Sequence, residues 1–252
     1  MKSSTVKLGV ALCVLGSAAT AAANTQVDIP ALHDAMIFAT SAGADTGNAS
    51  GKGPAMFAGA DGGSGKKRSL VTFDLGTYIP SGVTIDSVEM RLVIGQIAGS
   101  GMGGDGSNYP DRTIHVYHLT TAWSEGSSGS PTSTTIGGTG QGYTISTGDT
   151  SWHYTSFSGS HWTADGGDYT AMEIGNNTFH SPFSLGQVCS WTSAGLKADV
   201  VSWQSNPSGY LGWLIVSDLE TSATSFLGWW TIDGANANMN SGLQPILRVV
   251  YH

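Results

Sequence analysis

The sequence predicts an all-β protein, built as an antiparallel two-sheet β-sandwich of jelly-roll type. Three observations support this prediction: only 11% of the residues are charged, 36 of the 252 residues are glycine, and several short segments alternate apolar and polar side chains. Alternation with a period of two places one face of a strand in a core and the other toward water. Many such strands joined by polar loops favour two packed antiparallel sheets.

The first residues have the layout of a secretory signal peptide. Lys2 and Lys7 precede a short apolar run, and three alanines stand directly before Asn24. We therefore expect a signal peptide at residues 1–23 and one secreted domain at residues 24–252, in an extracellular or periplasmic location. The apolar run is too short to span a bilayer, so we expect no membrane insertion.

The first strongly patterned strand is expected at residues 69–75. Its alternate residues Val71, Phe73 and Leu75 can face a core. The proline at position 80 and the glycine at position 82 supply the chemistry of a tight turn. This stretch therefore predicts a core strand that ends in a turn.

The clearest alternation follows at residues 84–94, where apolar Val88 and Met90 alternate with charged Glu89 and Arg91. One face of this strand is expected in the core and the other in water. The other expected strands are 35–39, 113–119, 152–157, 198–203, 210–216, 225–232 and 246–251. The glycine-rich segments between strands, which we expect to be surface loops too polar to be buried, are 43–65, 99–106 and 126–142.

A family signature begins at Arg68, which opens an apolar strand ending in Phe-Asp-Leu at 73–75. An Ile-Pro-Ser-Gly-Val-Thr-Ile turn follows at 79–85. Matching segments continue in order at 118–127, 148–152, 162, 166–169, 198–203, 206–213 and 245–251. Together they resemble the DNRLRE domain, a secreted β-domain related to the disaggregatase family and to carbohydrate-binding module family 96. The resemblance implies a jelly-roll sandwich that binds carbohydrate.

The chain departs from this family near its end. Relatives usually carry a Ser-Arg-Glu element where this chain has Phe-Leu-Gly-Trp-Trp-Thr-Ile-Asp at 226–233. Any role of that arginine and glutamate therefore does not carry over to this protein.

Charge and cysteine content narrow the classes of partner. Without residues 1–23 the chain has 8 basic and 18 acidic residues, a net charge of 8 − 18 = −10. Long-range electrostatics therefore disfavours nucleic acid and anionic membrane surfaces as partners. Cys189 is then the one remaining cysteine, which excludes an internal disulfide and is typical of a small buried residue.

Aromatic and basic residues are the candidates for ligand binding. A tryptophan stacks its flat face on a sugar ring and keeps a polar N–H at its edge. Trp123, Trp203 and Trp213 lie in family-like core segments, so we expect them to be structural. On a strand, adjacent tryptophans at 229 and 230 face opposite sides, which leaves one of them available. The ligand-binding candidates are Trp152, Trp162, Trp229, Trp230, Lys66 and Lys67.

Three loop carboxylates, Glu125, Asp149 and Asp168, suit an oxygen-rich calcium site together with backbone carbonyls. The alternative for such residues is turn capping, because Asp beside Gly commonly binds its own backbone. Calcium is therefore the one cofactor that the sequence suggests, in a structural role.

These features predict a secreted, non-catalytic polysaccharide-binding or cell-surface matrix protein. Two alternatives stay open: a polysaccharide lyase or glycoside hydrolase, and a self-associating structural subunit. A lyase needs a base, for which Tyr117, His115 and His153 are candidates, but no pattern selects a catalytic residue. His115 and His118 do not form a metal pair, because residues three apart on a strand point to opposite faces.

Overall fold

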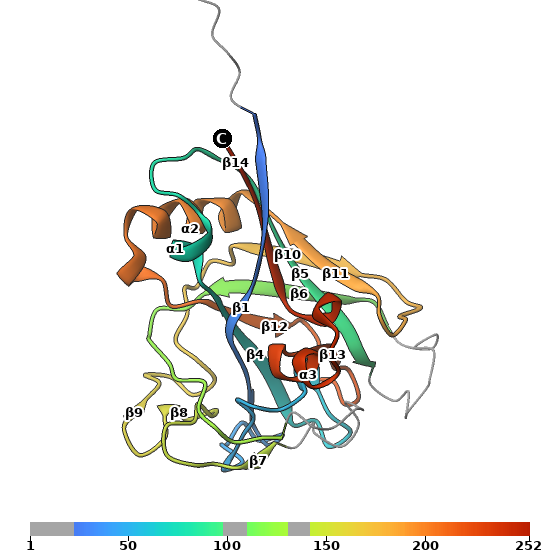
Figure 1. Cartoon of the computed structure of the whole chain (residues 1–252). Helices are drawn as coiled ribbons and strands as arrows, with labels where there is room; N and C mark the ends of the chain where they lie inside the picture. The colour runs from blue at the N-terminus through green and yellow to red at the C-terminus, as the bar shows by residue number, and fades with distance from the viewer. Residues whose placement is uncertain (1–22, 98–109, 131–141) are drawn as a thin grey trace, which may run out of the picture.

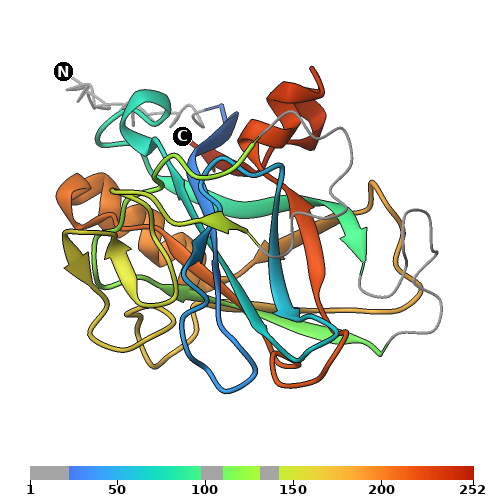
Figure 2. The same cartoon turned by 90° about the horizontal axis from the view of Figure 1, so that it is seen from below.

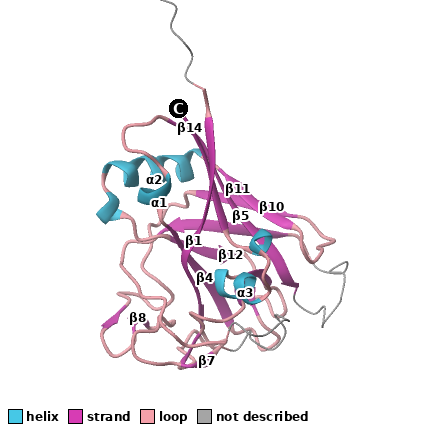
Figure 3. Ribbon diagram, in the orientation of Figure 1, coloured by secondary structure: helices cyan, strands magenta, loops and turns pink. Residues whose placement is uncertain are grey.

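The structure is a computed structural model that describes residues 23–97, 110–130 and 142–252. The described residues are mostly β, with 42% strand and 14% helix, which confirms the predicted β class. The helices are few and lie at the periphery of the strands (Figure 3). The predicted signal peptide falls outside the described residues, apart from its last position. Within the described part of the chain, no helix is long and apolar enough to cross a bilayer.

The described residues form fourteen strands, which are, in chain order, β1 (Thr25–Phe38), β2 (Asn48–Ala49), β3 (Ala55–Ala60), β4 (Lys66–Phe73), β5 (Ile85–Ile97), β6 (Arg112–His118), β7 (Tyr143–Thr144), β8 (Tyr154–Ser156), β9 (Ser160–His161), β10 (Gly175–Phe179), β11 (Val188–Thr192), β12 (Trp213–Ser217), β13 (Leu227–Trp230) and β14 (Ile246–Tyr251). The helices are α1 (Leu75–Tyr78), α2 (Ala194–Ser205) and α3 (Ile232–Ala237), with the short 3₁₀ turns η1 (Pro207–Gly209) and η2 (Ser241–Leu243).

Six strands pair in a closed ring, in the order β1, β14, β5, β13, β3, β4 and back to β1. Every one of these pairings is antiparallel. From the ring, β4 continues the sheet through β12, β6 and β10, while β11 pairs with β5. The β8–β9 hairpin lies on the same side of the strands as α2 in both views (Figures 1 and 2).

Strand β1 is the seam of this ring. Its first half, from Thr25, pairs with β14, and its second half, from Ala31, pairs with β4. The register shifts between Ala31 and His33, so Leu32 is the extra residue of a β-bulge. The bulge lies where β1 passes from one partner strand to the other.

Two apolar clusters hold the strands together. The larger fills the interior and contains Trp191, Trp213 and Trp229, which are all at most 1% exposed. The smaller lies on the other face of β1, β4 and β12, where Trp152 and Trp162 cover it. The alternation of the predicted strands is explained by these two faces, since each apolar set contacts one of the clusters.

One predicted strand is instead a helix. The sequence placed a strand at 198–203, whereas α2 covers Ala194–Ser205. Ser193 caps it, because its hydroxyl oxygen accepts the N–H of Leu196 at 3.0 Å. Leu196, Val200 and Trp203 are its buried residues, and spacings of four and three define one face of a helix.

The segment 43–65 also differs from its prediction as an unburied polar loop. It contains β3, whose six residues Ala55–Ala60 are all buried between β13 and β4. Four of the six are Ala or Gly, which suits close packing inside the ring, while Met56 and Phe57 are among the largest fully buried side chains of the described residues. Strands β10 and β11 were not predicted either. Cys189 on β11 is buried as predicted, and this burial raises the pKa of its thiol to about 12.

Candidate binding groove

A row of three adjoining hollows runs past the bulge of β1. The helix hollow, of about 500 Å³, lies between α1 and α2. The tryptophan hollow, of about 200 Å³, surrounds Trp123, and it shares Leu32 and Tyr210 with the helix hollow. The loop hollow, of about 510 Å³, lies over 124–127 and 147–148, and it shares His33 and Trp123 with the tryptophan hollow. We call the three together the groove.

The β-bulge explains how β1 supplies two neighbouring side chains to the groove. In a regular strand, consecutive side chains point to opposite faces. At the bulge this alternation breaks, and Leu32 and His33 are both exposed, with 51% exposure for Leu32. Bulges commonly re-aim side chains in this way next to functional sites.

Trp123 forms the middle of the groove. Its indole N–H donates to the carbonyl oxygen of Leu211 at 3.0 Å, which fixes the ring. The ring is only partly buried, and it lines both the tryptophan hollow and the loop hollow. The sequence predicted that Trp123 is structural and did not predict its partial exposure. Trp203 and Trp213 are buried as predicted.

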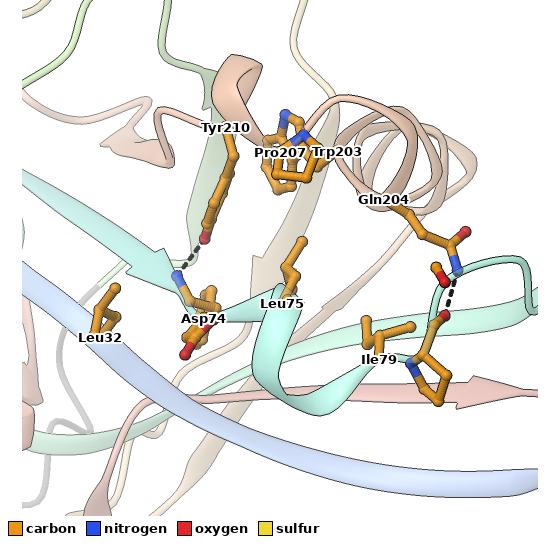
Figure 4. Close-up of a pocket in the computed structure, with 12 residues that line it drawn as sticks. Leu32, Asp74, Leu75, Ile79, Trp203, Gln204, Pro207 and Tyr210 are labelled. Carbon is orange, nitrogen blue, oxygen red and sulfur yellow. Dashed lines mark hydrogen bonds between the residues drawn. The ribbon is translucent and has the colours of Figure 1, made fainter.

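Aromatic rings line the helix hollow (Figure 4). The rings of Trp203 and Tyr210 have centroids 4.0 Å apart. The hydroxyl oxygen of Tyr210 accepts the backbone N–H of Phe73, and burial raises the pKa of this hydroxyl well above its usual value. Leu75 of α1 and Ile79, which directly follows α1, face these rings across the hollow.

A charged cluster supports the other end of the groove. Glu125 is only 8% exposed and accepts three hydrogen bonds, from Lys52 Nζ at 2.6 Å, from His33 Nδ1 at 3.2 Å and from the backbone N–H of Asp34 at 3.2 Å. Lys52 Nζ also lies 3.4 Å from Asp233. The imidazole of His33 is thus held by Glu125 at the edge of the loop hollow.

The charged cluster shifts the pKa values of its carboxyl groups in opposite directions. Burial opposes ionisation of Glu125, but the hydrogen bonds from His33, Lys52 and Asp34 outweigh it and hold the pKa of Glu125 below its usual value. Burial raises the pKa of Asp34 well above its usual value, and the charges of Glu125 and Asp233 add to this rise. Burial likewise raises the pKa of Asp233. The cluster therefore places one carboxyl group with a lowered pKa beside two whose pKa values are raised.

Most of the predicted ligand-binding tryptophans are buried. Trp152 and Trp162 are 3% and 4% exposed, and the indole N–H of Trp162 donates to the carbonyl oxygen of Ser151 at 2.9 Å. Trp229 is fully buried, whereas Trp230 is partly exposed, as expected for neighbours on one strand. Burial of their faces removes Trp152, Trp162 and Trp229 from the ligand-binding candidates, because a stacked sugar needs an open ring face.

The two predicted ligand-binding lysines differ in exposure. Lys67 is 2% exposed, and its ammonium lies 3.3 Å from Asp61 and over the ring of Phe38. Burial lowers the pKa of Lys67 despite the nearby carboxylate. Arg68 binds Glu220 through two hydrogen bonds of 2.8 and 2.9 Å, and Lys66 is partly exposed beside it. The positive charge of this stretch is thus largely neutralised inside the protein.

The three predicted calcium ligands have other partners. Glu125 binds Lys52 and His33, as described above. Asp149 is fully buried and accepts hydrogen bonds from the backbone N–H groups of Ser127, Ser128 and Ser146. Asp168 accepts from the hydroxyl of Thr121 at 2.8 Å and from the N–H groups of residues 163 and 164. Asp149 and Asp168 thus bind backbone N–H groups, as the capping alternative expects. The described residues contain no group of three or more acidic, His or Cys side chains that could hold a metal ion.

The candidate lyase bases do not lie in the groove. His115 bonds to Glu173, while His118 bonds to Asp199, so the two histidines serve opposite faces as predicted. His153 bonds to the exposed Asp165. Burial raises the pKa of Tyr117, which is the wrong direction for a base.

Sequence reasoning missed most of the groove. Leu32 and His33 carry no motif, and their shared exposure depends on a bulge that only strand pairing creates. Tyr210 was placed in an ordinary strand, although the residues before Trp213 form a loop. No protein-family model matches the chain, and no curated protein matches its sequence.

Proposed function

We propose that this protein is a secreted, non-catalytic polysaccharide-binding protein of the DNRLRE type. The observation that carries the proposal is the groove itself, in which three hollows adjoin in a row with a partly exposed tryptophan at the centre. An elongated groove suits a polymer, because successive sugar units can occupy successive hollows. Trp123 supplies a flat apolar face of the kind that stacks on a sugar ring.

The polar end of the groove supports the same proposal. His33, half of whose side chain is exposed, and the hydroxyl and backbone groups of 124–127 offer donors and acceptors for sugar hydroxyls. Because Glu125 holds His33, little orientational freedom is lost when a ligand binds there. Binding would combine one stacking contact with several hydrogen bonds, as in many shallow carbohydrate sites.

We propose that the ring of strands is a flattened jelly-roll sandwich of the DNRLRE type. Two layers support it: β14, β5 and β11 extend on one side of the seam strand β1, and β4, β12, β6 and β10 extend on the other. The proposed location of the protein, outside the cytoplasm, rests on the signal-peptide pattern of residues 1–23.

One observation favours a second candidate, a polysaccharide lyase or glycoside hydrolase. A histidine oriented by a carboxylate at the edge of a groove is the arrangement of a general base, and His33 with Glu125 has this form. The self-associating subunit has less support, since ring closure leaves β10 and β11 as the edges of the ten-stranded network. These two are linked by the side-chain amide of Asn177, which donates to the carbonyl oxygen of Ser190 at 2.8 Å.

The test is retention of the purified mature chain by a panel of neutral and acidic polysaccharides, first with calcium and then with chelator. Release of reducing or unsaturated chain ends is recorded in parallel. We expect retention without product, and a loss of about tenfold in affinity in Trp123→Ala, because one aromatic contact contributes about 1.5 kcal/mol. Trp230→Ala, a partly exposed tryptophan on β13 that does not line the groove, is the matched control.

New chain ends that disappear in His33→Ala would contradict the non-catalytic proposal and support the enzyme. Equal losses in Trp123→Ala and Trp230→Ala would move the binding site away from the groove. Loss of retention in chelator alone would restore calcium as a part of the site, whereas unchanged retention leaves the hydrogen-bonded roles of Glu125, Asp149 and Asp168 as their function.

A further inference from the structure

The helix hollow differs in chemistry from the rest of the groove. Its walls come from Leu32, Leu75, Ile79, Trp203, Pro207 and Tyr210 (Figure 4). Leu32 is 51% exposed at the junction with the tryptophan hollow, although leucine side chains are usually buried. Its exposed surface is therefore available to an apolar ligand that enters the helix hollow from the groove.

Three polar side chains around this hollow already make hydrogen bonds within the protein. Asp74 caps α1 by accepting the N–H of Thr77 at 3.2 Å. The side-chain amide of Gln204 donates to the carbonyl oxygens of Pro80 and Val83 at 2.9 and 3.3 Å. The hydroxyl oxygen of Tyr210 accepts a backbone N–H. A sugar placed here would exchange its hydrogen bonds with water for few new ones, which costs free energy.

An apolar group that enters the hollow gains free energy, because it moves from water to apolar walls and gives up no hydrogen bond. A volume of about 500 Å³ is in the range of sites that enclose small organic ligands. The carboxylate of Asp74 at the wall and the acidic net charge of the protein oppose a free fatty acid. The chain that enters must therefore be joined to a neutral group.

We infer that the helix hollow is a subsite for a short hydrocarbon chain, carried through an ester or glycosidic linkage by the saccharide that occupies the rest of the groove. This inference rests on the proposed polysaccharide-binding function and names its ligand class, an apolar-substituted saccharide. Leu32 and Tyr210, which line both hollows, stand where the saccharide passes into its substituent.

Calorimetric titration with methyl, butyl, hexyl and octyl glucoside, below their micelle concentrations, tests the inference. We expect affinity to rise by about fourfold per added methylene, the equivalent of ~0.8 kcal/mol, until the hollow is full. Octanoate should bind more weakly than octyl glucoside. In Leu32→Ser the dependence on chain length should flatten, while Leu185→Ser, which changes an equally exposed leucine outside the groove, should behave as wild type. Folding of both variants is checked by thermal melting.

Affinity that does not change with chain length, in a protein that polysaccharides still retain, would overturn the subsite and leave the proposed function standing. Tighter binding of octanoate than of octyl glucoside would overturn the neutral linkage. Chain-length dependence in a protein that no polysaccharide retains would overturn both the proposed function and a saccharide-borne occupant. An equal response of Leu32→Ser and Leu185→Ser would place the hydrocarbon elsewhere on the protein.

Discussion

Replacement of Asp34 by asparagine tests the charged cluster behind the groove. The side chain of Asp34 is fully buried, and one carboxyl oxygen accepts the backbone N–H of Ile232 at 2.8 Å. The other oxygen is buried and has no hydrogen-bond partner among the described residues. Asparagine has nearly the same shape, keeps an oxygen acceptor and does not titrate. The substitution therefore removes the ionisation of the group and little else.

The sign follows from proton linkage. Burial raises the pKa of Asp34 in the folded protein above its ordinary value of 3.8, so the folded state binds more protons than the unfolded state between these two values. The contribution of Asp34 to stability is complete below pH 3.8 and is lost as the pH rises toward the folded-state pKa. Within this window the free energy of unfolding falls by ~1.4 kcal/mol per pH unit, or about 3 to 6 °C in Tm for a domain of this size.

The assay is thermal unfolding of wild type, Asp34→Asn and Glu125→Gln at a series of pH values from about 2 to 8, which covers the window of each group. The stability of Asp34→Asn relative to wild type should rise with pH at up to the slope given above, and any constant offset from the new amide leaves that slope unchanged. Glu125→Gln should show the opposite pattern, because the pKa of Glu125 is lowered. Its contribution is present above pH 4.5 and lost as the pH falls through the folded-state pKa. Parallel curves for wild type and Asp34→Asn would refute the reasoning.

Three further predictions concern the loops and the core. Asp149→Ala should destabilise the protein by about 3 kcal/mol, because it leaves several buried donors of the neighbouring loops without their acceptor, and urea unfolding measures this loss. Gly126→Ala should lower Tm more than Gly148→Ala: both glycines have positive φ, but a Cβ at 126 would lie 2.0 Å from Asp149 Oδ1, whereas one at 148 meets nothing within 4 Å. The thiol of Cys189 should stay unmodified by a thiol reagent at pH 8 until the protein unfolds, and rapid labelling of the native chain would contradict its burial.

Local patterns predicted the strands whose two faces differ. The alternation of Val88 and Met90 identifies β5 because one side of that strand faces the core. The same reading of alternation failed at α2. Over a short stretch its apolar residues fit both a strand and a helix, and 198–203 was therefore predicted as a strand. This reading failed at β3 because a strand buried on both faces has no alternation to detect.

The groove could not be predicted from local sequence patterns, because the residues that line it are far apart in the sequence. His33 and Glu125 are 92 residues apart in sequence and come together only in the folded chain. The exposure of Trp123 likewise depends on a neighbouring loop, in which the carbonyl of Leu211 holds its ring. The signature at 68–85 therefore located a core strand and turn, and the turn proved to be one wall of the helix hollow.

The ring of strands also imposes an order on folding. Strand β14 follows every other strand in sequence, yet it lies between β1 and β5 in the ring. Until residues 246–251 are in place, β1 and β5 each expose an unpaired edge, and such edges template aggregation. A nascent chain has β4, β12 and β6 before it has β14, so the ring closes only when the last strand pairs. Protection of the unfinished edges until that strand is made then becomes a requirement of the topology itself.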